Sequence, residues 1–228
     1  MSAETTFVVS DLHLGSEHFR QRDFLFWLDH LPADSRLVLN GDVVDDARRP
    51  LGPEPRLVLE RLIAESCRRP VVWVRGNHDE GLVLPESGRV EFVERWEIGQ
   101  RLLVVHGAHL DQVMPRHGIF KWLFRRFHRL RVALGFRNVH VAEYAKRWRF
   151  LYRVLTEHVA RNALRAAREM GFAAIACGHT HAAMDLVAPD GRYLNTGAWT
   201  ERPLHYLRIE PDLIRLELFP GAPEEPAG

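Results

Sequence analysis

The sequence predicts a layered α/β domain, with either one mixed sheet or two packed sheets. Short runs of consecutive apolar residues recur along the 228-residue chain, and each run ends in a cluster of polar residues. Helical patterns separate the first of these runs, so strands and helices alternate at the start of the chain. Continuous apolar runs of this length are typical of strands that are buried on both faces.

Five apolar runs are predicted to be strands. They are Phe7-Val8-Val9, Leu37-Val38-Leu39, Val71 to Val74, Leu102 to Val105 and Ala173 to Ala176. Helical patterns lie around residues 20–31 and 54–66, and Pro32 and Pro70 mark where these helices end. Later segments, around residues 89–105 and 193–218, have the pattern of antiparallel strands.

A long helical segment interrupts this alternation. The pattern turns helical from Arg116 to about Met170, with a break at residues 135–138, and predicts a basic helical insertion at about 112–170. Residues 1–219 then form one domain that includes the insertion. The tail at residues 220–228 is rich in proline and glycine and is predicted to be disordered.

The composition is that of a soluble chain that can build its own core. Apolar residues make up 46% of the chain and charged residues 27%, which excludes disordered, collagen-like and coiled-coil classes. Cys67 and Cys177 lie far apart in a chain that needs no covalent links, so no disulfide is expected. The sequence shows neither a secretion signal nor a membrane span, and the cytoplasm is the predicted location.

Metal-binding side chains follow each of the five predicted strands. In chain order the clusters are Asp11-x-His13, Gly41-Asp42-x-x-Asp45, Gly76-Asn77-His78-Asp79, His106-Gly107 and Gly178-His179-Thr180-His181. The carboxyl ends of strands in layered α/β proteins meet at one edge, where loops assemble a site. Carboxylate, imidazole and amide ligands together suit Mn, Fe or Zn better than Ca or Mg.

A simpler interpretation exists for each cluster taken singly. An isolated Asp-x-His or Gly-Asn-His is more often a turn with a capping Asp or a hydrogen-bonded His than a metal site. Five clusters in this order, each directly after a strand, are hard to explain as turns. The glycines before Asp42, Asn77 and His179 allow sharp turns and a close approach of the backbone to an ion or phosphate.

These motifs resemble the signature of the calcineurin-like metallophosphoesterases. The resemblance implies a four-layer αββα sandwich with a helical insertion and a centre of two divalent metal ions. It implies that Asp11, His13 and His181 hold one metal, that Asn77, His106 and His179 hold the other, and that Asp42 bridges both. Two cations about 3.5 to 4 Å apart would clamp a phosphoryl group and make hydroxide available for in-line attack.

Three further residues are candidate catalytic groups. His78 follows the predicted ligand Asn77, which leaves its ring free to stabilise charge or to protonate the leaving oxygen. Asp79 or Asp45 could orient that ring, as carboxylates commonly do for functional imidazoles. A purely turn-stabilising role is the alternative for both carboxylates.

Other motifs resemble the UDP-2,3-diacylglucosamine diphosphatase branch of lipid A synthesis. They are Ser10 to Leu14, His106-Gly107 with Asp111, the helical basic insertion, Cys177 to His181, and Asn195 to Glu201. This resemblance implies a Mn-dependent enzyme that splits the pyrophosphate of UDP-2,3-diacylglucosamine into lipid X and UMP. The chain departs from the branch at His78, where Arg is usual, and at Ala108, where Asp is common.

The insertion concentrates positive charge in a chain whose formal net charge is only +1. Between Arg116 and Arg153, eleven Lys or Arg residues accompany one acid, Glu143, which leaves −9 for the rest of the chain. Aromatic residues are interleaved with these charges. Such a segment suits an anionic membrane surface or a lipid-linked substrate, which predicts a peripheral position on the inner face of the membrane. The candidate substrate-binding residues are Arg125, Arg129, Lys146 and Arg149.

Two alternatives remain for this segment. Its apolar residues could pack on the domain while the arginines are solvated. Its basic and aromatic residues could also bind single-stranded nucleic acid, in which case the enzyme is a phosphodiesterase or phosphatase for soluble nucleotides or nucleic acid. A scaffold that lacks metals is disfavoured because all seven proposed ligands are present. The sequence predicts no particular oligomeric state.

Overall fold

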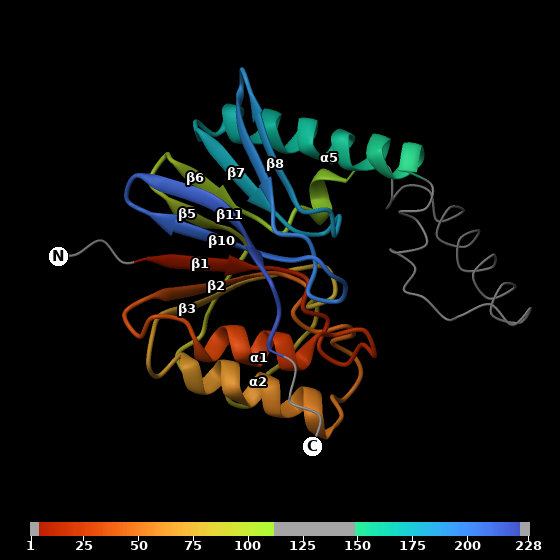
Figure 1. The fold of residues 1–228 in the computed structure, drawn as a ribbon, viewed down its shortest axis with the longest axis vertical. Coiled ribbons are helices and arrows are strands. Elements are labelled where there is room, and N and C mark those ends of the chain that lie inside the picture. Colours follow the sequence, from red (N-terminus) through yellow and green to blue (C-terminus); the bar gives the residue numbers. More distant parts are fainter. Residues whose placement is uncertain (1–4, 112–148, 224–228) are drawn as a thin grey trace, which may run out of the picture.

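The computed structural model describes residues 5–111 and 149–223, which fold into four layers (Figure 1). Helices α1 (Gln21–Asp29) and α2 (Pro53–Glu65) form the first layer. A six-stranded sheet, a five-stranded sheet and helix α5 (Arg149–Glu169) follow in that order. The predicted αββα sandwich is confirmed.

The first sheet has the strand order β11-β10-β1-β2-β3-β4. Strands β1 to β4 are parallel, whereas β10 is antiparallel to β1 and β11 to β10. Because β1, β2 and β3 run in the same direction, their carboxyl ends lie at the same edge of the sheet. The strand bounds are β1 (Thr6–Val9), β2 (Arg36–Asn40), β3 (Val71–Val74), β4 (Glu91–Val93), β10 (Leu204–Glu210) and β11 (Leu213–Phe219).

The second sheet has the strand order β5-β6-β7-β9-β8. Its three central strands are parallel, and β5 and β8 pair with them in the antiparallel direction. A short 3₁₀ helix, η1 (Ala108–Leu110), follows β6. The strand bounds are β5 (Trp96–Ile98), β6 (Leu102–Val104), β7 (Ala174–Cys177), β8 (Met184–Ala188) and β9 (Gly191–Asn195).

Two predictions for the strands need correction. The segment 89–105 is only partly antiparallel, because β4 pairs with β3 in the parallel direction. The sequence pattern also missed β8, an edge strand whose middle residues are exposed. An edge strand that faces solvent carries no continuous apolar run, so the signal used for the other strands is absent from it.

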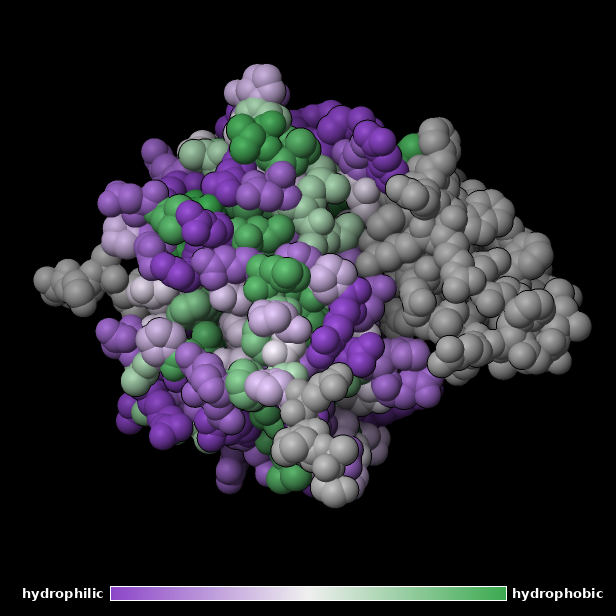
Figure 2. Space-filling model, in the orientation of Figure 1, coloured by the Kyte–Doolittle hydropathy of each residue, from purple (hydrophilic) through white to green (hydrophobic). Residues whose placement is uncertain are grey.

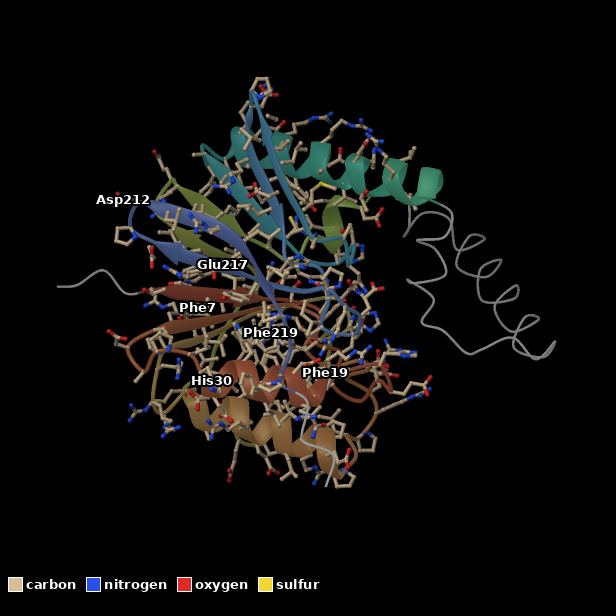
Figure 3. The ribbon with its side chains drawn as sticks, viewed as in Figure 1. Phe7, Phe19, His30, Asp212, Glu217 and Phe219 are labelled. Carbon is tan, nitrogen blue, oxygen red and sulfur yellow. The ribbon has the colours of Figure 1, made fainter. Side chains whose placement is uncertain are left out.

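Three apolar cores separate the four layers. Successive side chains of a strand point to opposite faces of the sheet, so Phe7 packs against the helices while Val8 packs between the two sheets. Phe7 and Phe219 lie in the layer between the first sheet and α1 (Figure 3). This double burial explains why the strands are continuously apolar.

Helix α5 is a layer of the sandwich and not part of an appended segment. Its residues Val159, Ala160, Ala163 and Leu164 are buried against the second sheet in the third core. The predicted insertion at about 112–170 therefore extends too far along the chain, because an amphipathic helix gives the same pattern in either place. Residues 112–148 of the predicted insertion lie outside the described residues.

The first part of the predicted disordered tail packs against α1. The Ala222 backbone N–H donates to Asp23 at 2.8 Å, and the Arg22 guanidinium donates to the Pro223 carbonyl at 2.6 Å. Polar contacts to the helix thus position residues 220–223 although they bury little apolar surface. Residues 224–228 lie outside the described range.

Hydrophilic residues are spread over much of the face shown in Figure 2. Within residues 5–111 and 149–223, no helix is long and apolar enough to cross a membrane. Cys67 is exposed and Cys177 is buried, and both are free cysteines.

Candidate metal centre

The five polar clusters converge where strands of both sheets end. Asp11, Asp42 and Asn77 follow strands of the first sheet, whereas His106 and His179 follow strands of the second. Hydrogen bonds join these loops. The Asp11 N–H donates to the Gly41 carbonyl at 3.0 Å within the first sheet, and the His179 N–H of the second sheet donates to the Asp11 carboxylate at 3.1 and 3.2 Å. The loops of the two sheets therefore form one connected framework.

The first group of predicted ligands consists of Asp11, His13 and His181. His181 Nε2 lies 3.2 Å from both Asp11 Oδ1 and His13 Nε2. Asp11 is fully buried and His13 is 3% exposed, so the three ligand atoms face one another away from bulk solvent. The structure thus brings together the complete set that was predicted for one metal.

The second group consists of Asp42, His106 and His179, with Asn77 beside it. His106 Nε2 lies 3.1 Å from Asp42 Oδ2 and 3.2 Å from Asn77 Oδ1. His106 Nδ1 donates to the Asn40 carbonyl at 3.0 Å, because a carbonyl oxygen can only accept. This hydrogen bond directs His106 Nε2 toward the proposed metal position.

Asp42 lies between the two groups, although a bridging role stays a prediction. Its carbonyl oxygen accepts a hydrogen bond from the His13 N–H at 3.0 Å, while its carboxylate faces His106. Burial alone would lower the pKa of His13, but the hydrogen bond to Asp45 and the charges of Asp11 and Asp42 together raise it. Its side chain therefore interacts with members of both groups.

Five of the predicted ligands have an unusual backbone conformation. Asp11, His13, Asp42, His179 and His181 have positive φ angles of 55°, 52°, 51°, 63° and 55°. Among residues 5–111 and 149–223, they are the only residues other than glycine with positive φ. Such conformations persist only where the surrounding structure enforces them, and they concentrate at functional sites.

The glycines before the ligands allow the loops to pack tightly. A Cβ on Gly76 would collide with the backbone N and the carboxylate of Asp42. A Cβ on Gly178 would meet the Asp11 carboxylate and would lie 2.7 Å from Ser10 Oγ. The loops thus pack closely on one another at both glycines, and the predicted close approach of the backbone to an ion or phosphate stays a prediction.

The electrostatics of the metal-free site favour charged pairs. Burial alone would raise the pKa of Asp42, but the charge and hydrogen bond of His106, together with the charges of neighbouring histidines, outweigh burial and hold this pKa well below its usual range. Burial alone would lower the pKa of His106, but the charge and hydrogen bond of Asp42, together with the charge of Asp11 and the hydrogen bond to Asn40, raise the pKa of His106 to about 9. A buried carboxylate thus balances a buried imidazolium until a cation replaces the proton.

The donor set fits divalent metals. Each of the two groups brings together carboxylate and imidazole atoms that lie within 4.8 Å of one another, and Asn77 adds an amide oxygen to the second group. Buried charged groups of this kind are retained in proteins where they pair or bind metal ions. Donors of this mixed type suit Mn, Fe or Zn, and the identity of the metals stays a prediction.

His78 lies at the exposed side of the site. Its ring centre is 4.9 Å from that of His13, and its backbone N–H donates to Asp42 Oδ1 at 2.8 Å. Its Nδ1 donates to the Asp45 carbonyl oxygen at 2.5 Å, which leaves Nε2 as the remaining ring nitrogen. This geometry places an oriented, accessible imidazole beside the first group of ligands.

The contacts of Asp79 match the turn-stabilising alternative for this residue. It is 1% exposed, and its carboxylate accepts hydrogen bonds from the N–H groups of Val43, Val44 and Gly76 and from the Trp73 indole, at 3.0 to 3.1 Å. These contacts connect the loop after β2 to the loop after β3. Asp79 therefore positions the backbone around Asp42 and Asn77, and its carboxylate does not contact the His78 ring.

Asp45 orients His78 through its main chain. The Asp45 carboxylate lies 3.2 Å from His13 Nδ1, so it contacts a predicted metal ligand. His78 contacts the carbonyl oxygen of the same residue. An Asp45 carboxylate oxygen and ring nitrogens of His13 and His78 also lie within 4.8 Å of one another, so orientation of His78 by the Asp45 carboxylate stays a prediction.

Sequence reasoning assigned no role to Asp111, which lies in the site. The side chain is 5% exposed, and its Oδ2 lies 3.2 Å from His179 Nε2. The spacing His106-Gly107-x-x-x-Asp111 was the available signal. The sequence could not show that the turn of η1 brings this carboxylate back to a loop of another strand.

The predicted substrate-binding residues fall largely outside the described structure. Arg125, Arg129 and Lys146 lie in residues 112–148. Arg149 is the first residue of α5.

Comparison with known proteins places the chain among phosphoesterases. The calcineurin-like phosphoesterase family matches residues 5–183. No curated protein matches the chain significantly.

Several solved structures are similar to the chain. A predicted phosphoesterase from Streptococcus pneumoniae is 19% identical, with a TM-score of 0.41, over 96% of this chain and 90% of its own. The E. coli phosphoesterase Yfce is 17% identical, with a TM-score of 0.46, over 92% and 90% of the two chains. The nuclease MPE from Pseudomonas putida is 27% identical, with a TM-score of 0.34, over 41% of this chain and 50% of its own.

Proposed function

Because the chain belongs to the calcineurin-like phosphoesterase family, and is thus a metal-dependent phosphoester hydrolase, we propose that it cleaves a lipid-linked pyrophosphate. The proposed substrate is UDP-2,3-diacylglucosamine or a similar lipid-linked nucleotide. The proposed location is the cytoplasmic side of an anionic membrane surface.

The position of Asp111 carries this proposal. Asp111 contacts the predicted ligand His179 at 3.2 Å, and it is the last described residue before residues 112–148. The chain therefore reaches the start of the basic and aromatic segment beside the metal centre. The sequence that follows has eleven Lys or Arg residues between positions 116 and 153, a composition that suits an anionic headgroup with apolar chains.

In the proposed reaction, bound metal ions and His78 have different roles. Two bound cations would polarise the phosphoryl group and lower the pKa of a water molecule. Hydrolysis forms a P–O bond to the oxygen of water and breaks the P–O bond to the leaving group, which then needs a proton. His78 is exposed and is held by the Asp45 carbonyl at 2.5 Å, so it is placed to deliver that proton.

The decisive test is hydrolysis by purified protein loaded with Mn²⁺. We expect release of UMP from UDP-2,3-diacylglucosamine in mixed micelles, with rates that increase in the presence of anionic liposomes. His78→Ala is expected to keep its metal content and to lose about 10² to 10⁴ in turnover. Absence of UMP release from this substrate and from related lipid-linked diphosphates would contradict the proposal.

A second candidate function is hydrolysis of soluble nucleotides or nucleic acid. It is favoured by His78 and Ala108, the two positions at which the chain departs from the lipid A branch. An enzyme of this kind would cleave nucleotide or single-stranded DNA substrates equally well with and without detergent or liposomes.

A further inference from the structure

A pocket of about 370 Å³ borders the metal centre on the side of Asn77 and His106. Its other walls include Arg75, Glu80, Glu94 and His109, which come from the loops after β3 and β4 and from η1. The volume is at the lower end of the range for sites that bind small molecules.

The Arg75 guanidinium packs over the ring of Phe92. Its guanidinium carbon is 5.3 Å from the centre of the Phe92 ring, and that ring lies 5.3 Å from the ring of the buried Trp73. Arg75 Nε also lies 3.5 Å from Glu94 Oε1, and the Arg75 backbone N–H donates to the Val93 carbonyl at 2.9 Å. The guanidinium plane is therefore oriented before any ligand binds.

The chemistry of the walls discriminates among three kinds of ligand group. A second phosphate would meet the carboxylates of Glu80 and Glu94, which repel anions. An acyl chain would have to remove water from both carboxylates and from Arg75 without any compensating hydrogen bond. A nucleoside offers a flat base to stack on a guanidinium, and hydroxyl and N–H donors for the carboxylates.

We propose that this pocket binds the nucleoside part of the substrate, with the base stacked on Arg75 and the ribose hydroxyls hydrogen-bonded to Glu80 or Glu94. The inference rests on the proposed function, since it names a part of the substrate of the same site. Nucleoside and lipid would then lie on different sides of the metal centre, near Arg75 and near Asp111.

Binding of UMP to the Mn²⁺-loaded protein tests this proposal without turnover. We expect Arg75→Ala to weaken UMP binding about tenfold, within the range that stacking of one base contributes. Binding of inorganic phosphate should change much less. Arg75→Lys keeps the charge but loses the flat stacking surface, so we expect it to bind UMP nearly as weakly as Arg75→Ala.

Arg95→Ala is the matched control. Arg95 forms an exposed ion pair with Glu97 at 2.8 Å and does not line the pocket, so its removal should leave UMP binding unchanged. Unchanged UMP binding in Arg75→Ala would overturn the proposal. Equal losses for UMP, glucosamine 1-phosphate and inorganic phosphate would overturn it as well, because Arg75 would then contact the phosphate.

The experiment separates this inference from the proposed function. Loss of UMP binding in Arg75→Ala, in a protein that cleaves no lipid-linked substrate, would support the pocket and contradict the lipid substrate. Hydrolysis of the lipid-linked substrate with an unchanged KM in Arg75→Ala would support the proposed function and contradict the pocket.

Discussion

At the scale of single residues, the metal centre is defined by side chains whose backbone is held in a costly conformation. Asp11, His13, Asp42, His179 and His181 all have positive φ. Each such residue costs on the order of 1 to 3 kcal/mol, which the rest of the fold must offset. The cost fits a site that must direct seven ligands inward from five loops.

Asp111 is expected to strengthen metal binding through His179. A carboxylate that contacts a ligating imidazole fixes the orientation of the ring and raises its basicity, and loss of such a partner typically costs 10- to 100-fold in metal affinity. We therefore expect Asp111→Asn to weaken binding of one metal equivalent by about this factor, measured by competition with a chelator.

Asp212→Asn is the control for this substitution. Asp212 lies in the turn between β10 and β11, at the edge opposite the site (Figure 3). If Asp111→Asn binds both metal equivalents as tightly as the wild type, the positioning role of Asp111 is wrong.

The pair of His106 and Asp42 makes the metal-free protein sensitive to alkaline pH. Burial alone would lower the pKa of His106, but the charge and hydrogen bond of Asp42, with smaller contributions from Asp11 and Asn40, raise this pKa to about 9. A raised pKa contributes stability that is fully present below the ordinary histidine pKa of about 6.5 and is lost as pH rises through 9. We expect the free energy of unfolding of protein treated with EDTA to fall by about 3 kcal/mol between pH 6.5 and 9.

Urea unfolding across this pH range measures the effect. The slope with pH should be much smaller in His106→Gln, which has no titrating group at this position. An identical pH dependence of the wild type and His106→Gln would contradict the assignment.

At the scale of elements, the turns after the strands determine how closely the ligands approach. We expect Gly76→Ala to lower the affinity for both metals and to destabilise the protein by about 1 to 3 kcal/mol, because its Cβ would overlap the Asp42 backbone and carboxylate. Gly52→Ala is the matched control, since its Cβ would have only Pro55 Cδ nearby, at 4.0 Å. Normal metal content and thermal stability in Gly76→Ala would show that the turn can relax.

The elements also show where a pattern along the chain misleads. Residues 149–169 have the pattern of a helix, and a helix forms there. Only its burial against the second sheet shows that it is a layer of the sandwich. The parallel pairing of β4 with β3 could likewise not be predicted, because the sequence of a strand does not show which other strand it pairs with or in which direction.

At the scale of the whole molecule, the metal centre links the two sheets. Each proposed ligand group takes side chains from both sheets: Asp11 and His13 join His181, and Asp42 joins His106 and His179. Bound metals would therefore stabilise the folded state against separation of the sheets. Ligand at 100 times its Kd contributes about 2.7 kcal/mol per site.

We expect Mn²⁺ to raise the Tm of the EDTA-treated protein by roughly 5 to 10 °C per occupied site. Differential scanning calorimetry over a series of Mn²⁺ concentrations measures this shift. Asp42→Asn should show a smaller shift, because it removes a charge from the centre. A Tm that does not depend on Mn²⁺ would contradict the proposed centre.

The sequence by itself determined the layered fold class and the polar clusters that carry the candidate ligands, whereas the division of these ligands into two groups came from the resemblance to a family. Both depend on local features: apolar runs that are buried on two faces, and polar clusters that directly follow them. Because the carboxyl ends of parallel strands lie at the same edge of a sheet, clusters that follow the strands are expected to meet there. The prediction of the αββα sandwich drew in addition on the resemblance of these motifs to a family.

Only the tertiary structure decided which groups surround the ligands. Asp111 reaches His179 across 68 positions, Asp79 connects the loops after β2 and β3, and Asp45 contacts His13 with its carboxylate and His78 with its carbonyl. The pocket at Arg75 likewise depends on Phe92 and η1 lying beside the loop after β3. Such contacts depend on how separate segments pack, and no spacing along the chain encodes the distance between them.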